Sequence, residues 1–287
     1  MPADPADPLP GRVVIAGGRA VRVVEQDGDG PGVLLLGGCG VPFYAWDDVV
    51  ALLPTRRVVR MDRPGLGTPW PGRLPALAEE IETLRELLLS VEGLAVAPVV
   101  VAHSMAGPHV EGLVRRYPDR VSALVLVDGS VDDRPAPSRR PDRALGRARA
   151  GYRILSGLPP ARRLGPLGDR LLSSVQSTRL RLGTPRPAEQ RIVFRSPDAV
   201  AAVLAEAGTY HAQLADLAAL RVSTSWPGVE TRVLTAAGDG GAGWVRLQAG
   251  LAELLGARQT VVGDSRHLMM IDRPDLIADA ILALARH

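Results

Sequence analysis

The chain has 287 residues, 46% of them apolar, and a formal net charge of +3 at pH 7. This length fits one large α/β domain or two small ones, and the apolar fraction is sufficient for a sizeable core. The absence of any run of about 18 apolar residues argues against a transmembrane span. The single cysteine, Cys39, excludes an intramolecular disulfide and suits a reducing compartment. We therefore expect a soluble, cytoplasmic protein that has no membrane partner.

The first half of the chain alternates between strand and helix patterns. Residues 1–11 are polar and predict a disordered tail without a signal peptide. Apolar runs then predict strands at 12–16, 20–25, 33–36, 57–61, 99–101 and 122–127. Helical spacing occurs from near residue 45, at 76–92 and after residue 104. This alternation is typical of a mostly parallel sheet covered on both faces, so we expect an α/β fold.

The alternation stops at residue 129 and resumes near residue 222. Residues 129–221 are rich in Arg and Pro and show helix-like segments without a convincing strand. Strand patterns return at 231–236 and 259–262, and helical patterns at 244–255 and 274–285. We therefore predict one core, residues 12–128 and 222–287, interrupted by a helical cap at 129–221.

The cap carries an excess of positive charge. Residues 129–195 contain 15 arginines and five acidic residues, a net charge of +10, whereas the rest of the chain has a net charge of −7. Such a segment either pairs with the acidic body or attracts an anionic partner, and internal pairing is the simpler interpretation. Because few aromatic residues accompany these arginines, nucleic-acid binding is not expected.

Ser104 lies where a buried strand runs into a helix through very few residues. Such a sharp turn holds its central side chain away from the sheet, which is the geometry of a nucleophile elbow with the pattern Gly-x-Ser-x-Gly. Alanines, Ala102 and Ala106, stand at both glycine positions here. A serine that only caps the following helix is the simpler alternative.

Four separate stretches resemble the α/β-hydrolase family: residues 34–38, the Asp-Arg-Pro-Gly-x-Gly stretch at 62–67, the turn at 102–106, and His267 in a late loop after a strand. The resemblance extends from about residue 12 to the C-terminus. It implies an eight-stranded, mostly parallel sheet with a helical lid inserted after the sixth strand.

Catalysis of this type needs a nucleophile, a base and an acid that orients the base. The resemblance implies Ser104 as the nucleophile and His267 as the base, because the family order is serine, acid, histidine. Two residues are candidates for the acid. Asp239 follows a strand at the usual offset and is preferred, whereas Asp128 ends the preceding strand at a position that some relatives use.

The family stabilises the developing oxyanion with two backbone N–H groups. By position these belong to Met105 and Cys39, and the Cys39 thiol itself is expected to be a small buried group. Where the family usually has His-Gly, this chain has Gly37-Gly38, so a side chain that braces the loop is missing.

These features predict a serine hydrolase that cleaves an ester, thioester or related acyl bond of a small molecule through an acyl-enzyme. The alternative is a non-hydrolytic, ligand-binding protein that retains the fold. A Gly-rich stretch at 238–243 formally fits a dinucleotide-binding pattern but overlaps the residues of the triad. We expect no cofactor and no metal site. A weaker hypothesis is that the basic cap receives an anionic carrier, such as an acyl carrier protein or a coenzyme A thioester.

Overall fold

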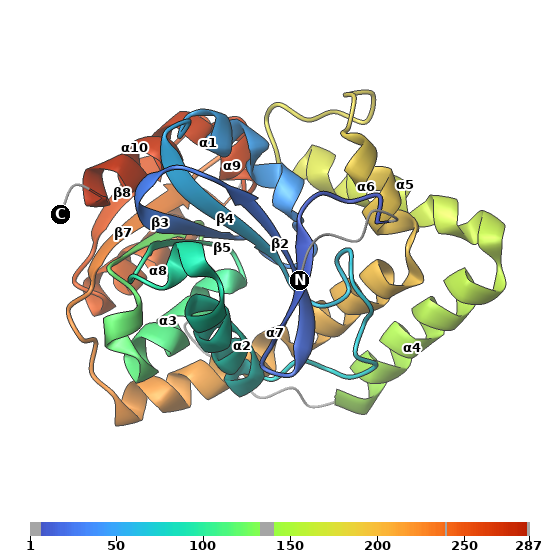
Figure 1. The fold of residues 1–287 in the computed structure, drawn as a ribbon, viewed down its shortest axis with the longest axis horizontal. Coiled ribbons are helices and arrows are strands. Elements are labelled where there is room, and N and C mark those ends of the chain that lie inside the picture. The colour runs from blue at the N-terminus through green and yellow to red at the C-terminus, as the bar shows by residue number, and fades with distance from the viewer. Residues whose placement is uncertain (1–6, 133–140, 239, 286–287) are drawn as a thin grey trace.

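The computed structural model describes residues 7–132, 141–238 and 240–285. Its centre is an eight-stranded sheet in the order β1-β2-β4-β3-β5-β6-β7-β8 (Figure 1). Strand β2 pairs antiparallel with β1 and β4, and all other neighbours are parallel. The strands are β1 (Arg12–Ala16), β2 (Arg19–Gln26), β3 (Asp29–Leu36), β4 (Arg56–Asp62), β5 (Val99–His103), β6 (Ala123–Val127), β7 (Glu230–Ala236) and β8 (Arg258–Val262). The predicted α/β fold is confirmed.

Alternating side chains on the central strands build an apolar layer on each face of the sheet. Leu34 and Leu36 of β3 point to one layer, whereas Val33 and Leu35 point to the other. The first layer is covered by α2 (Leu77–Ser90), α3 (Ala106–Arg116) and α8 (Gly241–Leu254), and the second by α1 (Asp47–Ala51), α9 (Met269–Asp272) and α10 (Pro274–Leu284). The short η1 (Phe43–Trp46) precedes α1, η2 (Glu92–Leu94) follows α2, and η3 (Pro118–Arg120) follows α3.

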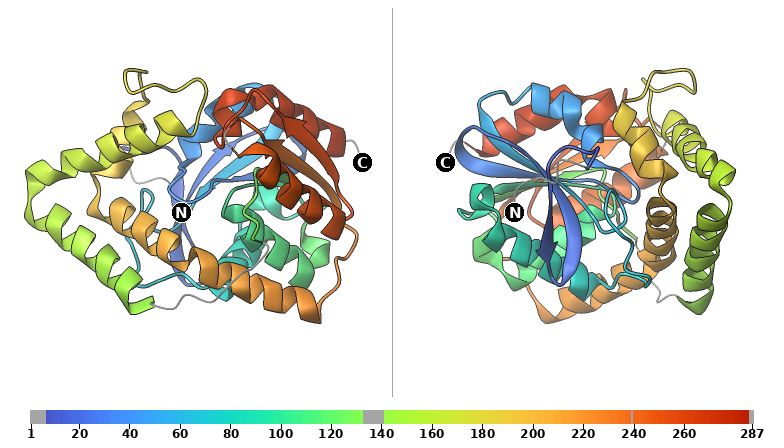
Figure 2. Two further views of the ribbon diagram at one scale, coloured as in Figure 1. Left: turned by 180° about the vertical axis from the view of Figure 1, so that it is seen from behind. Right: turned by 45° about the vertical axis from the view of Figure 1, so that its right-hand side comes forward.

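The insertion between β6 and β7 is helical, as predicted. It contains α4 (Pro141–Gly157), η4 (Pro159–Arg163), α5 (Leu164–Val175), α6 (Ala188–Arg195) and α7 (Pro197–Ser223), and no strand occurs within its described residues. Helices α4, α5 and α6 lie together to one side of the sheet, and the long α7 runs from them back to the core helices α2 and α3 (Figures 1 and 2). We call α4–α7 the cap.

Part of the predicted disordered tail packs against the core. Residues 1–6 lie outside the described residues, but Leu9 is buried, and Asp7 accepts a hydrogen bond of 2.5 Å from Arg22. The Arg22 guanidinium also donates to the carbonyl oxygen of Gly67 at 2.9 Å, so one buried cation joins the N-terminal segment to the loop after β4. The composition of residues 1–11 did not predict this contact, because the partner, Arg22, lies outside that segment in β2.

None of the helices in the described part of the chain combines the length and apolarity needed to span a bilayer.

Candidate functional site

Ser104 sits in a strained turn between β5 and α3. Its φ is +52°, and Ser104 and Asp128 are the two non-glycine residues with a positive φ in the described part of the chain. The turn is held because the Ser104 N–H donates to the carbonyl oxygen of Val127 at 3.1 Å and the Ser104 carbonyl accepts from Gly107 at 2.9 Å. Positive φ in a residue with a Cβ is costly and persists only where its surroundings impose it, often at functional sites.

The alanines that replace the usual glycines fit this turn. Ala102 and Ala106 are buried, and neither has a positive φ. The conformation that glycine favours is therefore confined to Ser104, so a methyl group on either side needs no unusual backbone. The departure from the glycine pattern does not distort the elbow.

A chain of hydrogen bonds links Ser104, His267 and Asp128. The Ser104 hydroxyl lies 3.0 Å from Nε2 of His267, and Nδ1 of His267 lies 2.6 Å from Oδ2 of Asp128. With Nδ1–H donating to the carboxylate, Nε2 is free to accept the serine proton. The three residues are far apart in sequence and meet because each follows a parallel strand (β5, β6 and β8) at the same edge of the sheet.

Asp128, the alternative acid in our prediction, is the carboxylate that contacts His267. Its side chain is buried, and its Oδ1 accepts from the Trp244 indole N–H at 2.7 Å and from the Ala236 N–H at 3.0 Å. These two donors leave Oδ2 directed at the imidazole. The preferred acid, Asp239, lies outside the described residues. Asp128 is therefore the candidate acid whose contact with His267 the described residues show.

The loop at residues 37–40 lies directly against Ser104. A Cβ added to Gly38 would lie 2.6 Å from Cβ of Ser104, so this close approach requires glycine. Cys39 follows Gly38, and Met105 begins the turn into α3, so the two predicted oxyanion donors lie on segments that flank the Ser104 side chain. Among the described residues, neither amide donates to a backbone carbonyl. Within the described part of the chain, both N–H groups are therefore without a main-chain acceptor.

His103 braces this loop and was not identified from the sequence. It is fully buried, its Nδ1 accepts from the Gly38 N–H at 3.2 Å, and its Nε2 donates to the carbonyl oxygen of His267 at 2.9 Å. Burial lowers the pKa of His103 well below its usual value, so the ring is neutral. One imidazole thus joins the loop at residue 38 to the loop of the candidate base, in a chain that lacks the family's usual histidine before Gly38.

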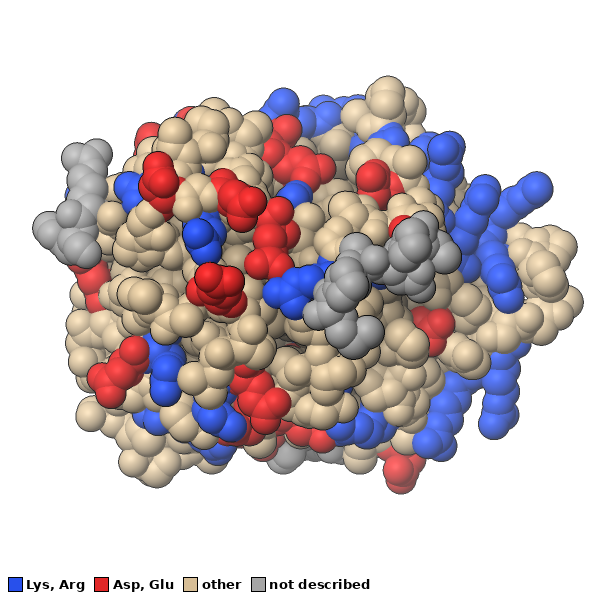
Figure 3. Space-filling view, in the orientation of Figure 1, with Lys and Arg blue, Asp and Glu red and all other residues tan. Residues whose placement is uncertain are grey.

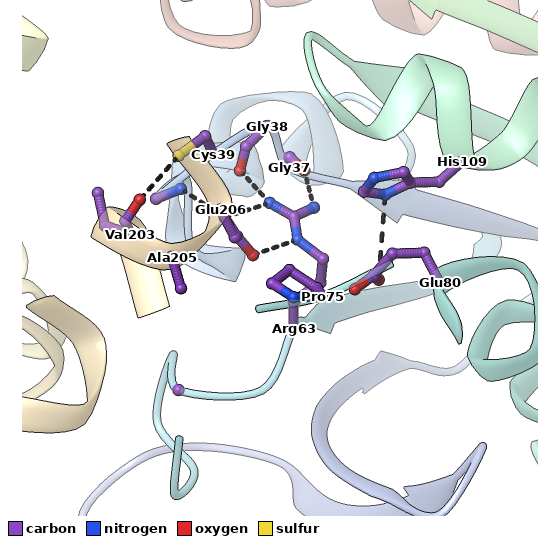
Figure 4. Close-up of polar contacts among 12 residues, drawn as sticks. Gly37, Gly38, Cys39, Arg63, Pro75, Glu80, His109, Val203, Ala205 and Glu206 are labelled. Carbon is purple, nitrogen blue, oxygen red and sulfur yellow. Dashed lines mark hydrogen bonds and ion pairs between the residues drawn. The ribbon is translucent and has the colours of Figure 1, made fainter. Parts of the chain in front are cut away.

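A second brace comes from Arg63, in the Asp-Arg-Pro-Gly stretch. Its guanidinium donates to the carbonyl oxygens of Gly37 and Gly38, each at 2.6 Å (Figure 4). The same group forms a bidentate pair with Glu206 of α7, at 2.6 and 3.0 Å. Both charges are buried, and charge-assisted bidentate pairs have strict geometry. The cap is therefore tied to the loop that carries Cys39.

The Cys39 thiol is not an activated group. Its Sγ contacts the carbonyl oxygen of Val203 (Figure 4). The distance between these two atoms is 3.6 Å, and the side chain is partly buried. Burial is the main cause that raises the thiol pKa far above its usual value, and the charge of Glu206 adds to this effect. The thiol is therefore protonated at neutral pH and is a poor nucleophile.

Two cavities adjoin the loop at residues 37–40, and both include Cys39 and Gly40 in their walls. One has a volume of about 350 Å³ and is enclosed mainly by apolar cap side chains, among them Leu164, Leu172 and Phe194. The other, of about 300 Å³, has polar groups such as Tyr44 and Arg186 in its wall. Volumes of this size lie at the lower end of the range for small-molecule sites.

Comparisons with known proteins agree with this architecture. The sequence matches the model of the Alpha/beta hydrolase family over residues 33–280. A search among curated proteins finds no match. Among solved structures, wild-type Cfl2 from Burkholderia cenocepacia is similar, with a TM-score of 0.71 and 20% sequence identity, covering 99% of this chain and 98% of Cfl2.

Two further solved structures resemble the chain. A thermophilic esterase from Thermogutta terrifontis has a TM-score of 0.67 and 22% identity, covering 96% of this chain and 97% of the esterase. The epoxide hydrolase CorEH has a TM-score of 0.65 and 17% identity, covering 95% and 97%. At such identities these likenesses show the fold alone. The family model, in contrast, spans most of the sequence, and the chain therefore belongs to the alpha/beta hydrolase family.

Proposed function

We propose that this protein is a serine hydrolase that cleaves a carboxylic ester or thioester of a small molecule. The observation that supports the proposal is the continuous hydrogen-bonded chain from Ser104 through His267 to Asp128. A serine hydroxyl is a weak nucleophile at neutral pH, and an oriented imidazole beside it supplies the missing base.

In the proposed reaction the Ser104 oxygen attacks the acyl carbon while its proton passes to Nε2 of His267. The Asp128 carboxylate stabilises the imidazolium, and the N–H groups of Cys39 and Met105 bind the negative oxygen of the tetrahedral intermediate. Collapse breaks the bond to the leaving alcohol or thiol, which takes the proton from His267. Water then attacks the acyl-enzyme with His267 as base, and the acid is released as Ser104 regains its proton.

The type of residue at position 104 distinguishes the proposed ester hydrolysis from the other reactions that proteins of this fold catalyse. The solved structures that resemble this chain include an epoxide hydrolase as well as an esterase. Epoxide opening and dehalogenation in this fold use a carboxylate nucleophile that forms an alkyl-enzyme ester. A serine at position 104 favours acyl transfer instead, because a hydroxyl activated by His267 forms an acyl-enzyme that water can cleave.

A fluorophosphonate probe tests the proposal, since it phosphonylates an activated serine irreversibly. We expect rapid labelling of the wild-type protein and none of Ser104→Ala. Ser223→Ala, which removes an exposed hydroxyl at the end of α7, should label at the wild-type rate. Turnover of p-nitrophenyl esters should disappear with Ser104→Ala while the circular dichroism spectrum stays unchanged. A folded wild-type protein that neither labels nor turns over esters would instead support the non-hydrolytic, ligand-binding alternative.

A further inference from the structure

Helix α5 of the cap turns its apolar side chains toward solvent. Pro166 is its one buried residue. Five of its side chains are between 49% and 62% exposed, and their spacing of three, four, one and three residues places them on one stripe of the helix: Leu164, Leu167, Leu171, Leu172 and Val175. Ile154 and Leu158, just before α5, are similarly exposed. We call the five α5 residues the α5 stripe.

The cap around the α5 stripe is strongly basic. Residues 141–195 contain 12 arginines and three acidic residues, a net charge of +9. Several of the arginines are exposed, including Arg149 and Arg153 of α4 and Arg163 beside the start of α5. In Figure 3 basic side chains project from the right-hand side of the molecule, where Figure 1 draws α4. An exposed apolar stripe on α5, together with exposed arginines on α4 and η4 of the same cap, is suited to contact with an anionic lipid surface.

The α5 stripe also adjoins the apolar cavity. Leu164 and Leu172 belong to both, and the same cavity is walled by Cys39 at the loop that flanks Ser104. A hydrocarbon chain that entered between these leucines would pass from the outer surface of the cap toward the loop that carries Cys39. The exposed apolar surface therefore continues into a cavity whose wall includes Cys39, one residue after the Gly38 that lies against Ser104.

We propose that the α5 stripe and its surrounding arginines dock the protein on an anionic phospholipid surface, from which the acyl chain of an ester substrate enters the apolar cavity. The second part rests on the proposed function, whereas docking does not. The contact requires no spanning helix, because the stripe would lie in the interface. A second copy of the chain fits this face poorly, since a symmetric contact would bring together two caps that each carry a formal charge of +9 over residues 141–195. An acidic carrier protein would pair with the charges of the cap arginines, but it would not account for the exposed leucines of the α5 stripe.

Co-flotation of the full-length protein with vesicles measures docking without catalysis. The probes are vesicles of phosphatidylglycerol and of phosphatidylcholine, at 0.1 M and 0.5 M NaCl. We expect binding to phosphatidylglycerol that weakens at high salt, and at least about tenfold weaker partitioning to phosphatidylcholine. The test variant is Leu167→Ser with Leu171→Ser, two residues that do not line the described cavities. It should lower partitioning to phosphatidylglycerol by about tenfold or more.

The matched control is Leu89→Ser with Leu254→Ser, which removes two leucines of similar exposure (46% each) from α2 and α8. This control should bind vesicles like the wild type, and both double variants should keep wild-type turnover of a short, water-soluble ester. Ser104→Ala should also bind vesicles normally, which separates a failure of docking from a failure of the proposed function.

Three results would overturn the proposal. The first is the absence of binding to phosphatidylglycerol at 0.1 M NaCl, and the second is binding that survives in the α5 double variant. The third is a dimer in light scattering that the same variant dissociates, which would assign the stripe to a second copy. Tight binding of an acyl carrier protein that Arg153→Gln with Arg163→Gln abolishes, without vesicle binding, would favour the carrier.

Discussion

The substitution Asp128→Asn tests the hydrogen-bonded chain of Ser104, His267 and Asp128 most directly. It removes the negative charge and replaces one carboxylate oxygen by an NH2 group, while the size and shape of the side chain stay the same. The Asn oxygen can still accept from Trp244 and Ala236, the two donors that hold Oδ1 now. Asn also tolerates a positive φ, so the backbone at residue 128 (φ +44°) needs no change. We therefore expect the Asp128→Asn protein to fold and to melt within a few degrees of the wild type.

The substitution Asp128→Asn changes which ring nitrogen of His267 carries the proton. With an amide NH2 facing it, Nδ1 must accept a hydrogen bond, so the ring proton moves to Nε2. Nε2 then can no longer accept the proton of Ser104, and the imidazolium has no negative partner. Removal of the acid's charge in such a relay lowers kcat by about 10³- to 10⁴-fold, which corresponds to about 4–5.5 kcal/mol of transition-state stabilisation.

Steady-state kinetics on a p-nitrophenyl ester, with Asp239→Asn as the parallel variant, measure this effect. We expect Asp239→Asn to change kcat by less than about threefold, because Asp128 already occupies the position beside Nδ1 of His267. If Asp239→Asn proves the more damaging variant, the assignment of Asp128 as the acid is wrong and the preference drawn from the sequence is restored.

The braces of the site and one buried acid give three further predictions. Glu206→Gln leaves the buried guanidinium of Arg63 without a counter-charge, so urea denaturation should show a loss of about 3 kcal/mol, and kcat should fall as the loop at residues 37–40 loosens. His103→Phe keeps a planar aromatic ring but leaves the Gly38 N–H and the His267 carbonyl unpaired, so we expect a loss of about 1–3 kcal/mol for each; an unchanged melting temperature would contradict this role. Burial raises the pKa of Asp62 to about 8 despite the hydrogen bond from the Phe43 N–H. The folded protein then holds a proton that the unfolded chain loses near pH 4, so Asp62 should lower stability as pH rises from about 4 to 8, by at most about 1.4 kcal/mol per pH unit. Asp62→Asn should flatten the pH dependence of denaturant midpoints over this range, and an unaltered slope would argue against a raised pKa.

The sequence located the candidate nucleophile and base because their signals are local. Ser104 stands between an apolar run and a helical pattern, and His267 stands just after a late strand, so periodicity and order along the chain suffice to find both. The same reasoning predicted the parallel sheet and the helical insertion, since buried strands and amphipathic helices each have a characteristic spacing of apolar residues. None of these features depends on knowing which residues meet in space.

The contacts around the site depend on three-dimensional packing, and they were missed or left open. Whether a carboxylate after β6 or one after β7 faces the imidazole depends on strand order and on the donors that Trp244 and Ala236 supply. The brace from His103 depends on a side chain placed between two loops, and no local pattern in the sequence indicates that contact. Glu206 lies 143 positions from Arg63, and nothing in its local sequence marks it as the partner of a buried arginine.

By itself, therefore, the sequence determined the order of strands and helices, the basic character of the cap, and the candidate residues for the nucleophile and the base. Only the tertiary structure decided which acid lies beside His267, how the loop that carries Cys39 is held, and that the leucines of α5 face solvent instead of a core. The physical reason is that apolar periodicity shows that a helix has an apolar face but not what covers that face. Hydrogen bonds and ion pairs between residues that are distant in the chain produce no periodic pattern in the sequence.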